Sequence, residues 1–219
     1  MYSAEAKSLA NEQVPEPAKQ RPRSDRWETF PPSWLSHHGG ACCELAREWV
    51  IAMDFAQLGG ADRASGPRWL RQKYKWGPSP WPMHWCEVVK RDTIDCGAHS
   101  ALAHAAFTAR GLTALPVQLV QSYSLDAADQ WRGSWQAEGV SCHWLDGDHI
   151  YHEATGLLTG TDELRIWDGS AGSWVNPRQG SGYGSLVALR VFSDGEGGPL
   201  ELGWGEQRVQ VNSWNQLRR

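Results

Sequence analysis

The sequence predicts an α+β fold, in which helices from the first half of the chain pack on an antiparallel sheet from the second half. Three observations support this prediction. Apolar residues recur at helical spacing before Gly111, and they alternate with polar residues at strand spacing after it. The two patterns also follow one another instead of alternating along the chain, which is typical of α+β domains.

Length and composition indicate one globular domain behind a tail. Of the 219 residues, 41% are hydrophobic and 21% are charged, which is an ordinary globular balance. Residues 1–32 contain several prolines, many charges and few apolar side chains, so we expect a flexible tail there. We expect a single domain over 33–219. The 14 tryptophans indicate a loop-rich protein with aromatic surfaces.

Charge and cysteine content exclude several classes of function. The net charge of −4 gives no electrostatic basis for binding nucleic acid. No apolar run is long enough to span a membrane, and the first 20 residues lack the apolar core of a secretory leader. The cysteines are odd in number and show no repeated C-x-x-C spacing, which argues against a disulfide scaffold or a zinc ribbon. They are Cys42, Cys43, Cys86, Cys96 and Cys142. We therefore expect a cytoplasmic protein with no metal, no cofactor and no membrane partner; the oligomeric state is left open.

Four segments are expected to be helical: 41–57, 69–74, 96–110 and 127–137. The first is followed by Gly59-Gly60 and the third by Gly111, and glycine commonly ends helices. In the first segment one side is expected to collect the large apolar residues Leu45, Trp49, Val50, Met53 and Phe55.

The second half is expected to form strands at 115–123, 149–154, 163–168, 186–192 and 208–211. The second and third of these flank Gly160-Thr161 and predict a hairpin. With a turn centred near Gly160, His152 would lie opposite Asp168 on faces that are otherwise apolar. Two polar residues on a buried face normally hydrogen-bond to each other, because an unpaired polar group there costs about 1–3 kcal/mol. Asp168-Gly169-Ser170 also has the composition of a turn.

Cys96 is the candidate nucleophile. It follows Asp95 and opens the helix predicted over 96–110. A thiol at a helix start faces unpaired N–H groups and the positive end of the macrodipole, which lowers its pKa. A cysteine nucleophile also needs a base and a group that orients the base. His149 and His152 are the candidate bases, and Asp168 is the candidate orienting residue. The alternative is a buried core cysteine without a chemical role.

The order Cys96, His152, Asp168 resembles that of the transglutaminase-like group of the papain-like superfamily. That group carries a cysteine at a helix N-terminus, then a histidine and an aspartate on neighbouring antiparallel strands. The predicted helix, Gly111 and the strand that follows are also similar, so the resemblance covers roughly 95–170, about a third of the chain.

Two positions depart from the family's pattern. The family often has an aromatic residue two positions after the histidine and a glutamate four positions after it, which Tyr151 and Glu153 supply for His149. The separation from Asp168 favours His152, so His152 is the preferred base and His149 the alternative. The family's tryptophan after the nucleophile is replaced by Gly97.

The resemblance implies thioester chemistry. Cys96 would attack the carbonyl of a peptide, amide or thioester-linked acyl substrate, and the histidine would protonate the leaving group. Water or an amine would then resolve the acyl-enzyme, so the protein would be a peptidase, an amidase or an acyl transferase. The N–H of Cys96 is a candidate oxyanion donor. The candidate substrate-binding residues are Trp81, His84, Trp85 and Tyr183.

Two other functions stay open at this point. The tryptophan-rich surface would also suit a non-catalytic module that binds a peptide or a sugar on the same fold. Histidines and cysteines gather at 37–43 and 142–152, as in a metal-dependent hydrolase, but neither group has a recognised ligand spacing.

Overall fold

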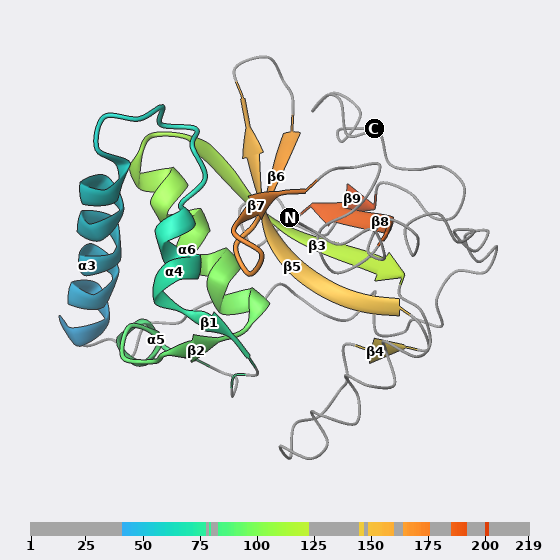
Figure 1. Cartoon of the computed structure of the whole chain (residues 1–219), viewed down its shortest axis with the longest axis horizontal. Helices are drawn as coiled ribbons and strands as arrows, with labels where there is room; N and C mark the ends of the chain where they lie inside the picture. The colour runs from blue at the N-terminus through green and yellow to red at the C-terminus, as the bar shows by residue number, and fades with distance from the viewer. Residues whose placement is uncertain are drawn as a thin grey trace, which may run out of the picture.

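A computed structural model describes residues 41–77, 79, 83–122, 145–146, 149–159, 164–175, 185–191 and 200–201. The helices lie together on one side, and the large sheet lies on the other (Figure 1). The coarse prediction of helices with an antiparallel sheet is therefore confirmed. The predicted tail at 1–32, the helix at 127–137 and the strand at 208–211 lie outside the described residues.

Three of the described helices match their predicted bounds to within one residue. They are α3 (Ala41–Leu58), α4 (Arg68–Lys73) and α6 (Cys96–Ala109). Gly59 and Gly111 follow α3 and α6 with φ of 55° and 79°. This left-handed backbone is the usual glycine signal for a helix end. A further short helix, α5 (Trp85–Val88), was not predicted. Within the described ranges, no helix combines the length and the apolar character needed to cross a membrane.

The predicted apolar side of α3 is wrong for three of its five residues. Leu45, Trp49 and Phe55 are 64%, 38% and 48% exposed. Val50 is buried as predicted and Met53 is partly buried. The other buried residues of the helix are Cys43, Ala46 and Asp54. Small side chains along this stripe let α3 approach its neighbours closely. Asp54 is buried because it forms an ion pair with Arg110, and a hydrophobic pattern cannot identify such a position.

The main sheet has the strand order β7-β6-β5-β3-β8-β9, with β4 also paired to β5. Every pairing among these described strands is antiparallel. The strands are β3 (Thr113–Ser122), β4 (Leu145–Asp146), β5 (His149–Leu158), β6 (Leu164–Asp168), β7 (Ser173–Trp174), β8 (Ser185–Val191) and β9 (Leu200–Glu201). Two short strands, β1 (Lys75–Trp76) and β2 (Thr93–Ile94), pair in parallel beside the helices.

The predicted hairpin is present as β5 and β6, but its register differs by two residues. Leu158 pairs with Leu164, and Thr155 pairs with Trp167. Continued by one step, this register places Asp168 opposite Ala154 and not opposite His152. A shift of two residues keeps each side chain on its face, because the strand period is two. His152 and Asp168 are therefore diagonal neighbours on one face.

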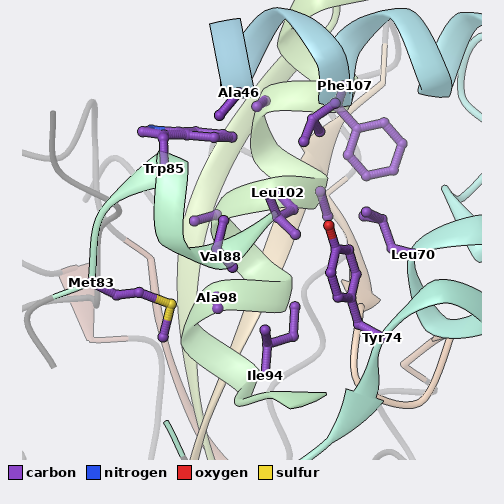
Figure 2. Packing of buried hydrophobic residues seen from close by; sticks show 14 of the residues in the cluster. Ala46, Leu70, Tyr74, Met83, Trp85, Val88, Ile94, Ala98, Leu102 and Phe107 are labelled. Atoms are coloured by element: carbon purple, nitrogen blue, oxygen red, sulfur yellow. The ribbon is translucent and has the colours of Figure 1, made fainter. Parts of the chain in front are cut away.

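The largest apolar core surrounds α6. Leu102 and Phe107 of α6 pack near Leu70 and Tyr74, which belong to α4 and the residue after it (Figure 2). The helix also contacts α3, β3, β5 and β6, and lies between α3 and the sheet (Figure 1). Its many alanines permit these close approaches from several sides. The helix that carries Cys96 is therefore held on nearly every face.

Candidate active site

The turn before α6 fixes the position of Cys96. Asp95 is the N-cap residue of the helix, and its Oδ1 accepts a hydrogen bond from the N–H of Ala98 at 2.9 Å. The N–H of Asp95 donates in turn to Ser79 Oγ at 3.0 Å. Such capping satisfies one of the unpaired N–H groups of a helix start. Cys96 is thus the first helical residue, as predicted, and it is half-buried.

The two carboxylate oxygens of Asp168 face different partners, the turn that follows β6 and the candidate base His152. Its Oδ1 accepts hydrogen bonds from the N–H groups of Ser170 and Ala171 at 2.9 and 3.0 Å. Its Oδ2 lies 3.0 Å from His152 Nε2. Both interpretations of Asp168 therefore hold at once, because one carboxylate oxygen builds the turn and the other faces the histidine. The buried turn leaves this carboxylate little freedom to rotate.

His152 lies between the carboxylate and the thiol. Asp168 and Cys96 both act on the imidazole of His152, since each of them raises its pKa. The thiol, the imidazole and the carboxylate thus follow one another in space in the order that nucleophilic catalysis by cysteine requires.

The pKa of the Cys96 thiol differs from the low value expected at a helix start. Burial raises the pKa of the Cys96 thiol, and the neighbouring His152 lowers it only in part. The acidic side chains of Asp95 and Glu153 raise the pKa further. The expected low pKa, argued from the macrodipole alone, is therefore wrong, because desolvation is the larger effect.

His152 itself favours its protonated form. Burial alone would lower the pKa of His152, but the charges of Asp168 and Cys96 raise it well above its usual range. An imidazolium beside the sulfur is what makes a thiolate accessible in this dry environment. A thiolate at Cys96 would therefore depend on His152 and, through it, on Asp168.

Two hydroxyl groups attach α6 to β5 close to this pair. Ser100 Oγ donates to the carbonyl oxygen of Ala154 at 2.7 Å, and Thr155 Oγ1 donates to the carbonyl oxygen of Ser100 at 2.9 Å. Ala154 is the first residue of β5 beyond its pairing with β6. Ser100 lies one helical turn after Cys96, and Ala154 lies two residues after His152. These bonds therefore set the position of Cys96 relative to His152.

Gly169 allows the Asp168 turn to lie directly against α6. A Cβ atom at this position would lie 3.0 Å from the Cβ of His99 and 3.1 Å from its carbonyl oxygen. Such contacts are tighter than ordinary packing permits. A larger residue would displace the turn, and with it the carboxylate that faces His152.

The start of α6 also supplies candidate oxyanion donors. The N–H of Ala98 is used by the Asp95 side chain, and that of His99 by the Asp95 carbonyl. Within the described part of the chain, the N–H groups of Cys96 and Gly97 make no such bond. They are oriented by the helix and lie next to the sulfur, where a tetrahedral intermediate would carry its negative oxygen.

Of the other predicted site residues, the structure describes the side chains of Trp85 and His84 only. Trp85 is 6% exposed and belongs to the apolar core with Ala46 of α3 (Figure 2), so packing accounts for its position. His84 precedes α5, and its N–H donates to Glu87 Oε2 at 3.1 Å. Trp81 and Tyr183 lie outside the described residues. His149 begins β5, but its side chain lies outside the described part.

Sequence reasoning missed Ser79, Ser100 and Thr155. Ser100 lies four residues after Cys96 and so occupies the same face of the helix, which was a usable signal. Nothing in the local sequence marks Ser79 or Thr155, because their partners are distant in the chain.

Comparison of the chain with protein-family profiles, with curated proteins and with solved structures found no match.

Proposed function

We propose that the protein is a cysteine-nucleophile enzyme that forms an acyl-enzyme on Cys96 from an amide or thioester substrate. His152 acts as the base and Asp168 orients it. The observation that carries the proposal is the 3.0 Å approach of His152 Nε2 to Asp168 Oδ2, with Cys96 close enough to the same imidazole to shift its pKa. A transglutaminase-like core, in a reducing compartment such as the cytoplasm, would suit this chemistry.

The reaction would proceed in two halves. In the reactive form the proton of the Cys96 thiol resides on His152, and the thiolate sulfur attacks the substrate carbonyl carbon. The resulting oxyanion is stabilised by the N–H groups of Cys96 and Gly97. The intermediate collapses when the imidazolium gives its proton to the leaving amine or thiolate, which leaves the acyl group on the sulfur. Water or an amine, deprotonated by His152, then displaces the sulfur and releases the acyl product.

The experiment is to trap the acyl-enzyme. The protein is incubated with an activated acyl ester, quenched in acid, and digested, and the acylated residue is identified by mass spectrometry. Acylation at Cys96 is expected, together with its loss in Cys96→Ser. Acylation confined to other residues, or equal at all cysteines, would refute the proposal and favour a binding module on this fold.

A further inference from the structure

A second group of thiols lies apart from the candidate active site, at the start of α3. Cys42 and Cys43 occupy the first turn of this 18-residue helix, and Cys86 belongs to α5. The three sulfur atoms all lie within 4.8 Å of one another. Cys43 Sγ and Cys86 Sγ are 3.4 Å apart although 43 residues separate them in the chain. The fold, and not local sequence, therefore brings the group together.

The spacing of these sulfurs suits a metal ion better than a covalent bond between two of them. Ligands of a tetrahedral metal ion with metal–sulfur bonds of about 2.3 Å lie about 3.8 Å apart. A disulfide instead needs its two sulfurs about 2.05 Å apart, and it would leave the third thiol unused. Changes of up to about 1 Å in the sulfur–sulfur distances would place all three sulfurs at ligand distance from a common centre.

The surroundings of the group also favour a cation held by thiolates. Cys43 and Cys86 are buried, whereas Cys42 is exposed and provides a route of entry. The N-terminus of α3 carries the positive end of its macrodipole, which stabilises the excess negative charge of three thiolates around one ion. Thiolate ligands select thiophilic ions such as Zn²⁺ and Cu(I) over Mg²⁺ or Ca²⁺.

We propose that Cys42, Cys43 and Cys86 form a three-thiolate site for a thiophilic d¹⁰ cation, Zn²⁺ or Cu(I). The ion would join the start of α3 to α5, and its ligand Cys86 lies ten residues before Cys96 in the chain. An exchangeable ligand such as water would fill a fourth position on Zn²⁺, whereas Cu(I) would be three-coordinate. The proposal is independent of the activity of Cys96. It also departs from the expectation of a metal-free protein, because the ligand spacing is visible only in the fold.

The test uses the full chain, reduced and freed of metal. Co²⁺, a spectroscopic substitute for Zn²⁺, should give a thiolate-to-metal charge-transfer band that saturates at one ion per chain. Zn²⁺ should bleach this band, and a Cu(I) titration against a competing chelator identifies the preferred ion. Cys42→Ser is the main variant, because an exposed side chain can be changed without disturbing the core. Its affinity should fall at least tenfold, and Cys96→Ser should bind as the wild type does.

Thermal unfolding gives an independent readout. One equivalent of the preferred ion should raise the Tm of the wild type and of Cys96→Ser, and leave that of Cys42→Ser unchanged. The proposal is overturned if no charge-transfer band appears. It is also overturned if Cys42→Ser binds Co²⁺ as tightly as the wild type does, or if the band disappears in Cys96→Ser.

Discussion

His152 Nε2 lies 3.0 Å from Asp168 Oδ2, although the two residues are diagonal and not opposite in the β5–β6 hairpin. The diagonal offset matters because Asp168 stands at the last position of β6. There the chain turns, and the N–H groups of the turn hold one carboxylate oxygen while the other remains for His152. A directly opposite residue within the strand would lack this second anchor.

Removing the charge of Asp168 should raise the pH at which Cys96 reacts. The charge of Asp168 helps to raise the pKa of His152, so Asp168→Asn should lower that pKa. The thiolate then loses its cationic neighbour and the pKa of Cys96 rises. A one-unit shift corresponds to about a tenfold slower alkylation at neutral pH. The measurement is the alkylation rate of Cys96 against pH. Asp62→Asn, which changes an exposed carboxylate, is the control; equal profiles for the two variants would contradict the prediction.

Breaking the hydroxyl contacts between α6 and β5 should reduce both stability and reactivity. Ser100→Ala leaves the carbonyl of Ala154 without its donor, at a cost of about 1–3 kcal/mol in the free energy of unfolding. Thr155→Val should cost a similar amount. Because the two residues contact each other, the double variant should lose less than the sum of the single losses. Urea denaturation measures these losses, and strictly additive values would show that the contacts are independent.

Removing one partner of the buried ion pair between Asp54 and Arg110 should destabilise the protein more than replacing both partners with apolar residues. Arg110 Nε and Nη2 donate to the two Asp54 oxygens at 2.6 Å, and Trp69 Nε1 donates to Oδ1 at 2.9 Å. Arg110→Met leaves a buried carboxylate uncompensated, which should cost about 3–5 kcal/mol. Asp54→Leu combined with Arg110→Met should recover part of this loss. Chemical denaturation of the three proteins checks the order, and a double variant less stable than Arg110→Met would contradict it.

His99 should make the protein sensitive to acid. Burial lowers the pKa of His99 to about 3, while Asp168 opposes this shift and Arg71 and His152 add to it. The unfolded chain takes up this proton near pH 6.5 and the folded chain only near 3. Stability present above pH 6.5 is therefore lost as the pH falls toward 3. At pH 5 the loss is about 2 kcal/mol.

The control for this prediction is His99→Leu, which cannot take up a proton. Between pH 7 and pH 5 its free energy of unfolding should fall by about 2 kcal/mol less than that of the wild type. Equal losses in the two proteins would show that other groups cause the acid sensitivity.

Helix bounds were predictable because their signals are local. Asp95 caps α6, and Gly111 ends it with the left-handed backbone that glycine adopts easily. The burial of Asp54 in α3 was not predictable, because it depends on the charge of Asp54 meeting Arg110, 56 residues later. The short strands β1 and β2 pair residues 18 apart. Each is too short to show the alternation of polar and apolar residues that predicts a strand.

In the candidate site, strand alternation predicted which side chains share a face, and that part is confirmed for His152 and Asp168. The exact register was not predictable, because it depends on the turn between β5 and β6. The pKa of Cys96 was misjudged for a related reason. The helix start is visible in the sequence, whereas the desolvation that outweighs it comes from the whole fold.

The central claim is that His152 activates Cys96, and the alkylation rates of individual cysteines test it most directly. Cys42 is exposed and Cys96 only half-exposed, so accessibility alone favours Cys42. The test is therefore how the iodoacetamide alkylation rate of each cysteine, in metal-free buffer, changes when a histidine is replaced. His152→Gln should slow Cys96 without slowing Cys42, and His149→Gln should leave both rates unchanged. A Cys96 whose rate is unchanged in His152→Gln, or that responds to His149→Gln and not to His152→Gln, would contradict the account.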